Sequence, residues 1–235
     1  MQQPNDGRFY FWTLRGRSTV RRILRDHLIE PAPTRGRCIR WSVFLKAHWR
    51  AVAASDFFTV EAWSWTGLVT HYVLFVIDLA TRRVSLCGIT THPNEAWMMQ
   101  IARNLLDSET GALRGKRHLI VDRDTKYSTE FRTFLAREGV QVIRLPPRSP
   151  NLNAYAERFI RSVREECLAK LIPIGAPMLR RALREYVSHY HLERNHQGLS
   201  NALIVPMPVR RPITAPIERR ARLGGILHFY ERAAA

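Results

Sequence analysis

Residues 119–163 read LIVDRDTKYSTEFRTFLAREGVQVIRLPPRSPNLNAYAERFIRSV, and this stretch decides the fold class. It begins as a short apolar run that ends abruptly at Asp122. An amphipathic helix, a short strand, a Pro-rich loop and a second helix are predicted to follow. Strands that alternate with helical patterns indicate parallel pairing, and ligands gather at the carboxyl ends of the strands in open α/β sheets. Asp122 is therefore expected where the chemistry takes place.

The second helix of this stretch carries a glutamate. Glu157 lies off the apolar stripe of the helix, on the same face as Arg161 and Arg164. The stripe has a helical period and consists of Leu152, Tyr155, Ala156, Phe159, Ile160 and Val163. A carboxylate beside basic residues on an exposed face is placed to meet both Asp122 and a phosphate backbone.

The charge of the chain predicts a polyanionic partner. Its 235 residues carry a formal net charge of +17, and the sequence pI is near 11. Nucleic acid is the partner that such a charge favours. A hydrophobic content of 46% supports a packed core and argues against wholesale disorder. Charge alone fits equally well a protein that acts on nucleic acid and one that only binds it.

Cysteine usage and hydropathy exclude several classes of protein. Cys38, Cys87 and Cys167 are far apart and form no CxxC pair, so neither a zinc knuckle nor a disulfide framework is predicted. No stretch reaches the roughly 18 to 20 apolar residues that a membrane span needs. The first residues lack a basic-then-apolar signal pattern. The expected location is the cytoplasm, with no membrane partner.

Three strand candidates precede the central stretch, at residues 51–63, 69–79 and 83–90. Their connections have hairpin length, which predicts an antiparallel meander. Asn94 is expected to cap the helix that follows. The order βββ-α-β-α-β-α-α therefore predicts an α/β fold in which the meander lies beside parallel strands.

An acid inside the first strand candidate is the second chemical signal. Asp56 is flanked by Phe57 and Phe58, and an acid in an apolar strand is costly unless it is paired or bound to a metal. If the first and fourth strands are neighbours, Asp56 and Asp122 lie side by side and repel each other. A divalent cation removes that repulsion, and Mg²⁺ binds carboxylates while keeping waters and phosphates as further ligands. Two such ions about 4 Å apart support phosphodiester displacement.

Over residues 50–205 the chain resembles the DDE integrase-core transposases of bacterial insertion sequences, a family related to retroviral integrases. The resemblance rests on motifs in order and on the 34 residues that separate Asp122 from Glu157. The motifs are SDFFTVE (55–61), YVLFVIDLATR (72–82), VDRDTKYS (121–128), PRSPNLNAYAERFIRSVREE (147–166) and YHLERNHQGL (190–199).

The resemblance implies an RNase H-like mixed sheet and metal-dependent cleavage and strand transfer of DNA, as in transposition and integration. It implies that Asp56, Asp122 and Glu157 are the catalytic and metal-binding residues, for Mg²⁺ with Mn²⁺ as a substitute. The partner is double-stranded DNA, both element ends and target, bound by a dimer or larger assembly in the cytoplasm near the nucleoid. The expected DNA contacts are Arg158, Arg161, Arg164, Lys126 and Arg148.

The expected organisation has three parts. Residues 1–48, with a net charge of +7, contain one basic helix that is either a helix-turn-helix remnant or an amphipathic helix packed on the main domain. Residues 49–205 are the RNase H-like catalytic core, and residues 206–235 are a basic, weakly structured tail. Two other functions remain open: a nuclease on the same fold without strand transfer, and a non-catalytic DNA-binding remnant.

Three other acids compete for the metal-binding roles. Family members often have glycine at the position of Asp124, and Asp122 is preferred because it directly ends the apolar strand. Glu61 falls on the opposite face of the strand from Asp56. Asp78 precedes a turn and is expected to be structural. Three histidines late in the chain are expected in polar packing or phosphate contact, not at a metal: His189, His191 and His196.

Overall fold

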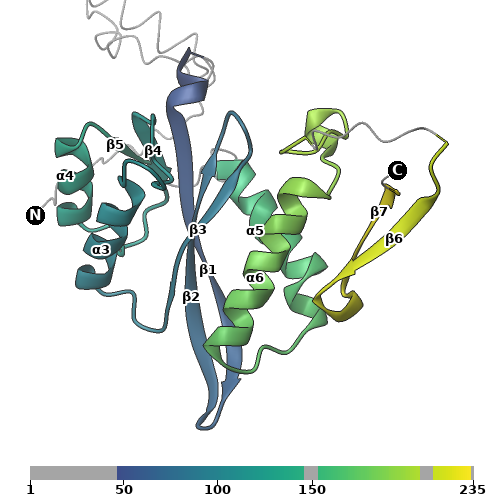
Figure 1. Cartoon of the computed structure of the whole chain (residues 1–235). Helices are drawn as coiled ribbons and strands as arrows, with labels where there is room; N and C mark the ends of the chain where they lie inside the picture. Colours follow the sequence, from purple (N-terminus) through teal and green to yellow (C-terminus); the bar gives the residue numbers. More distant parts are fainter. Residues whose placement is uncertain (1–46, 146–152, 207–213, 234–235) are drawn as a thin grey trace, which may run out of the picture. The chain divides into compact units, whose positions relative to one another are not determined.

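A five-stranded mixed sheet forms the centre of the computed structural model, which describes residues 47–145, 153–206 and 214–233 (Figure 1). The strand order is β3-β2-β1-β4-β5. Pairing is antiparallel between β1 and β2 and between β2 and β3, and parallel from β1 to β4 and from β4 to β5. The strands are β1 (Val52–Ser64), β2 (Gly67–Asp78), β3 (Val84–Thr90), β4 (His118–Val121) and β5 (Gln141–Arg144). The predicted α/β RNase H-like mixed sheet is confirmed.

The long hairpin of β1 and β2 sets the register of the sheet. Its pairing runs without a break from Ala53 opposite Asp78 to Ser64 opposite Gly67. Gly67 closes the hairpin at a φ of +112°, a backbone conformation that residues other than glycine rarely adopt. Because the register is regular, residues of β1 alternate strictly between the two faces of the sheet.

One face of the sheet is covered by α3 (Glu95–Leu105) and α4 (Thr129–Arg137). Asn94 caps α3 as predicted, since its side chain accepts the Trp97 N–H at 2.9 Å. Odd-numbered residues of β1 point to this side, because Ala53 belongs to the core formed with both helices. Other members of that core are Leu74, Leu119, Val121, Met98, Phe131 and Leu135.

The other face is covered by α5 (Ala154–Glu166) and α6 (Gly175–Leu192). Phe159 of α5 is fully buried, and its ring lies 4.8 Å from that of Phe75 in β2. Tyr186 and Tyr190 of α6 pack on the same phenylalanine. Even-numbered residues of β1 point to this side.

The last described segment is a hairpin, so the prediction of a weakly structured tail is wrong for these residues. β6 (Ile217–Arg222) and β7 (Leu227–Arg232) pair antiparallel around a short 3-10 turn. Arg222 forms ion pairs with Glu193 and Glu185, and Leu227 is buried. The ionic partners lie 29 and 37 residues away along the chain, where no local pattern shows them.

The described residues lie within the second of two units into which the chain divides, Ala47–Ala235. The possible helix-turn-helix remnant and Arg148 lie outside the described residues. The three-part division at residues 48 and 205 stays a prediction. Among the described helices, none is both long and apolar enough to cross a membrane.

Candidate active site

Sheet register brings Asp56 and Asp122 together. In the parallel pairing of β1 with β4, Ala53 lies opposite Leu119 and Ala54 opposite Ile120. Continued by two residues beyond Ala54 and Ile120, the same register places Asp56 beside Asp122. Asp122 directly follows β4, at its carboxyl end, and both acids are half-buried. Asp56 shares the parity of Ala54 and therefore points to the face that α5 covers.

Glu157 comes to the same place from α5. Phe75 is the cross-strand partner of Asp56 in the β1–β2 hairpin, and the ring of Phe159 packs against it. Glu157 precedes Phe159 by two residues and is exposed. The aromatic contact thus anchors the first turns of α5 above the strand that carries Asp56.

The electrostatics of Asp56 agree with this convergence. Burial raises the pKa of its carboxyl, the Phe57 N–H that it accepts at 2.8 Å lowers it, and the negative charges of Asp122, Glu157 and Asp124 raise it further, to about 7. The first effect is desolvation, and the last is repulsion between like charges. The carboxylates of Asp122, at the end of β4, and of Glu157, on α5, therefore lie close enough to Asp56 for their charges to raise its pKa.

Asp124 is already neutralised by a neighbour. Its Oδ2 lies 2.6 Å from Lys126 Nζ, while its backbone N–H donates to Asp122 Oδ1 at 3.0 Å. The Lys126 ammonium lies near the rings of Phe57 and Tyr72, on the face opposite Asp56. This arrangement favours Asp122 over Asp124 as a cation ligand. Lys126 would have to leave Asp124 to bind a phosphate.

The other competing acids have structural surroundings. Glu61 is exposed and has the opposite parity to Asp56 in an unbroken register. Asp78 pairs with Lys116 Nζ at 2.9 Å and accepts the Ala80 N–H at 2.9 Å. Asp78 therefore holds the β2–β3 turn, as the sequence predicted.

The three histidines are engaged in polar packing. His189 contacts Glu193 at 2.9 Å, and His191 Nε2 accepts the Val84 N–H at 2.8 Å. His196 Nε2 lies 2.7 Å from the Tyr190 carbonyl. These contacts are the polar packing that the sequence predicted for the three histidines.

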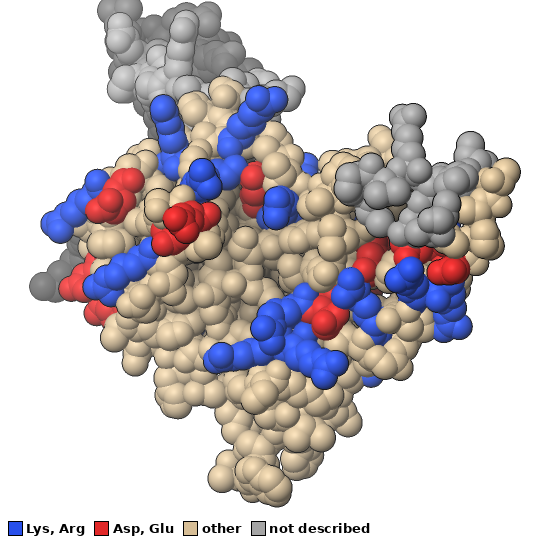
Figure 2. Space-filling view, in the orientation of Figure 1, with Lys and Arg blue, Asp and Glu red and all other residues tan. Residues whose placement is uncertain are grey.

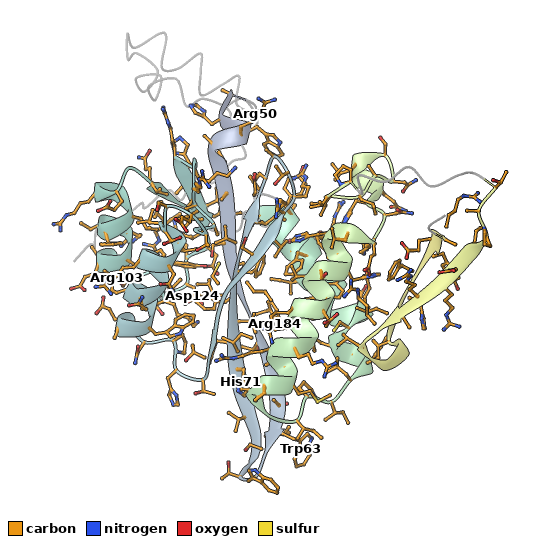
Figure 3. The ribbon with its side chains drawn as sticks, viewed as in Figure 1. Arg50, Trp63, His71, Arg103, Asp124 and Arg184 are labelled. Atoms are coloured by element: carbon orange, nitrogen blue, oxygen red, sulfur yellow. The ribbon has the colours of Figure 1, made fainter. Side chains whose placement is uncertain are left out.

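Exposed basic side chains lie on the two helices that cover the face of the sheet to which Asp56 points. Arg158, Arg161 and Arg164 are exposed on α5. Figure 2 shows further Lys and Arg side chains gathered over α6, which exposes Arg180, Arg181 and Arg184. Figure 3 places Arg184 on α6 and Asp124 between α3 and the central strands. The arginines of α5 can thus present cations to a polyanion on the same helix that carries Glu157.

The carboxylates suit a hard divalent cation. In the part of the chain that the structure describes, Asp56, Asp122 and Glu157 form no ion pair with Lys or Arg. Carboxylate oxygens with room for water and phosphate are what Mg²⁺ takes. Within the same described ranges, no three His, Cys, Asp or Glu side chains stand close enough to hold one ion together. Ligation by all three acids would therefore need side-chain movement or bridging waters.

The raised pKa of Asp56 predicts a pH-dependent cost to folding in a chelating buffer. A folded-state carboxyl pKa above the unfolded value means that the folded state binds more protons, so stability falls as pH rises from about 4 to about 7. Asp56→Asn should therefore stabilise the protein, and the gain should grow by about 2–3 kcal/mol between pH 5 and pH 8. Urea unfolding of both proteins at the two pH values measures the gain. Glu61→Gln is the control, and a pH-independent gain would refute the raised pKa.

Comparison with known proteins adds a family match. Residues 138–202 match the family model of the integrase core domain, a range that includes α5 and Glu157. The match confirms the resemblance to integrase cores that the motifs indicated. No curated protein matches the chain by sequence.

Solved structures with similar backbones include retroviral catalytic cores. The catalytic core domain of BIV integrase is 12% identical, with a TM-score of 0.43 over 60% of this chain and 84% of that one. The HTLV-2 integrase catalytic core in complex with magnesium, in its dimeric form, is 12% identical, with a TM-score of 0.46 over 60% and 86%. Its trimeric form is 13% identical, with a TM-score of 0.47 over 66% and 93%.

Proposed function

We propose that the chain is a transposase or integrase that cleaves DNA and transfers the cut strand in a metal-dependent reaction. The proposal is supported above all by the electrostatic proximity of Asp122 and Glu157 to Asp56, together with the β1–β4 register. The net charge of +17 and the integrase-core match over residues 138–202 support it. No covalent enzyme intermediate is required, because water and then a DNA 3′-hydroxyl serve as nucleophiles.

In this proposal Asp56 and Asp122 would hold two Mg²⁺ ions, for which Mn²⁺ could substitute, and Glu157 would complete the second site. When bound, the ions activate the attacking oxygen and stabilise the leaving one. Asp56 must first release its proton, because only the ionised carboxylate is a good ligand. Its pKa of about 7 makes this release easy at neutral pH.

The basic residues position the DNA backbone. Arg158, Arg161 and Arg164 extend from the exposed side of the helix that carries Glu157, so a phosphate bound there lies close to the carboxylates. Arg148 and Lys126 are proposed as further contacts. Joining two DNA ends to one target needs at least two active sites, so a dimer or larger assembly is proposed on double-stranded DNA.

One assay separates this function from its alternatives. The chain is incubated with Mg²⁺ and duplex DNA that carries the ends of the genetic element, and both cut and joined products are measured. Joined products support the proposal. Cut DNA without joined products would indicate a nuclease on this fold, and binding without metal-dependent cutting would indicate a non-catalytic DNA-binding protein.

DNA affinity should fall steeply with salt. Each phosphate that a Lys or Arg neutralises releases counterions, so the logarithm of the binding constant should fall by about 0.9 per contact for each tenfold rise in salt. With arginines along α5 and α6 the total slope should be about −4 or steeper. Fluorescence anisotropy with a labelled duplex at several salt concentrations measures it. A flat response would contradict nucleic-acid binding altogether.

A further inference from the structure

A basic cavity lies next to the candidate active site, on the same face of the sheet. It has a volume of about 490 Å³, within the range of ligand-binding clefts. Its walls include Ile77, Arg82, Tyr155, Arg158 and Gln197, and it is called here the Arg82 pocket. Arg158 directly follows Glu157 on α5. Ile77 is opposite Ala54 in the β1–β2 pairing, two residues from the pair of Phe75 with Asp56.

The charge of the pocket is uncompensated. Among the described residues that line it none is acidic, and Arg194 is the one of its three arginines that is paired, with Glu166 at 2.6 Å. Within the described chain neither Arg82 nor Arg158 forms an ion pair or a side-chain hydrogen bond. Two cations without counterions beside a concave surface favour an anionic ligand.

Arg82 is held with its donors free. Its guanidinium lies 3.4 Å from the ring centroid of Tyr155 and 5.1 Å from that of Trp49. Stacking on aromatic rings uses the flat faces of a guanidinium and leaves the N–H groups at its edge available. The Nη1 atom is buried and has no hydrogen-bond partner. A buried donor without a partner is costly unless a ligand supplies the acceptor.

The backbone conformation of Arg82 is a second, independent indication of a ligand-binding site. Arg82 has a φ of +64° in the turn between β2 and β3. Glycine adopts this conformation without strain, whereas arginine does not. Strained residues cluster at ligand-binding and catalytic sites. The turn therefore keeps, at some cost, a side chain that points into the pocket.

We propose that the Arg82 pocket binds a backbone phosphate of one DNA strand beside the phosphodiester that is cut, with Arg82 and Arg158 as the two clamping residues. The proposal rests on the proposed function for the identity of the ligand. Guanidinium groups bind phosphate oxygens through paired N–H donors, and Asn195 and Gln197 line the wall with further donors. The Arg158 Nη1 lies 3.8 Å from a Cβ built at Gly198, so its side chain reaches the loop that carries both amides.

The test is the affinity of the full chain for a labelled single-stranded oligonucleotide, in chelator and at physiological salt. Arg82→Gln and Arg158→Gln should each weaken binding about tenfold and reduce the salt slope by about one. Arg103→Gln is the matched control, because Arg103 is exposed on α3, which covers the other face (Figure 3). It should change affinity by less than about twofold.

Two further measurements keep the result clear. Unfolding midpoints without DNA show whether Arg82→Gln still folds, and the exposed Arg158 gives a variant with little structural burden. Inorganic phosphate is added as a competitor. Wild-type-like binding and slope in both variants would overturn the proposal, as would displacement of the oligonucleotide by millimolar phosphate, which would identify free phosphate as the ligand.

Chelator makes the test independent of catalysis. If element-end DNA is not cut but binding depends on Arg82 and Arg158, phosphate binding in the Arg82 pocket is supported and the proposed function is wrong. If DNA is cut and joined but both variants bind like the parent, the proposed function is supported and phosphate binding in the Arg82 pocket is wrong.

Discussion

Asp122→Asn should reduce metal-dependent DNA cleavage by about a thousandfold or more, while DNA binding and folding persist. The amide keeps the shape of the side chain but removes a charged oxygen ligand, and loss of a comparable electrostatic stabiliser costs several kcal/mol on the chemical step. Binding persists because arginines carry it. Asp56→Asn and Glu157→Gln should have similar effects, because each removes one of the three acids whose charges interact. Initial rates of end cleavage under excess Mg²⁺ measure the loss.

The matched control is Asp124→Asn, two residues away. Asp124 is paired with Lys126 at 2.6 Å, so its amide should free that lysine and retain most of the activity. Glu61→Gln, on the opposite face of β1, should also remain active. If Asp124→Asn is inactive while Asp122→Asn cuts normally, the metal ligand is Asp124 and the assignment of Asp122 is wrong. If all three amide variants of the triad are active, the metal-site hypothesis is wrong.

The positions of Asp56 and Asp122 on their strands were predictable, because strand patterns are local and the face of each residue follows from alternation. Their role as metal ligands stays a prediction. The run that ends at Asp122 indicated a strand, and β4 has those limits. Asp56 and Glu61 differ by an odd number of positions, so their opposite faces followed before the register was known. Pairing of the first with the fourth strand was only an assumption, and the structure supplies it.

The Arg82 pocket and the C-terminal hairpin were not predictable, because both depend on contacts between distant segments. Arg82 lay inside a motif that carried the resemblance, but its stacking on Tyr155 joins a turn to a helix more than 70 residues later. In the sequence Tyr155 was only one residue of the apolar stripe of its helix. Arg222 looked like one more charge in a basic tail until α6 brought Glu193 and Glu185 beside it.

Phe159→Ala should destabilise the protein by about 3–5 kcal/mol, a large part of the 5–15 kcal/mol that holds a typical domain together. Phe159 is fully buried, and its ring contacts those of Phe75, Tyr190 and Tyr186 at centroid distances of 4.8, 5.2 and 6.2 Å. Alanine leaves a cavity between the sheet and both helices of that face. Urea unfolding in chelator measures the loss. Phe134→Ala, at a partly buried position against the opposite core, is the matched control and should cost less.

The same substitution tests how Glu157 is positioned. Phe159 connects the helix of Glu157 to the strand residue opposite Asp56, so a looser α5 should lower cleavage even where the variant is folded. Phe159→Leu fills most of the cavity and should recover most of the stability, to within about 1–2 kcal/mol of the parent. Cleavage is therefore compared at a temperature where all three proteins are folded by circular dichroism. Activity should follow the order Phe, Leu, Ala. Equal activity in folded Phe159→Ala would mean that Phe159 stabilises the core without positioning Glu157.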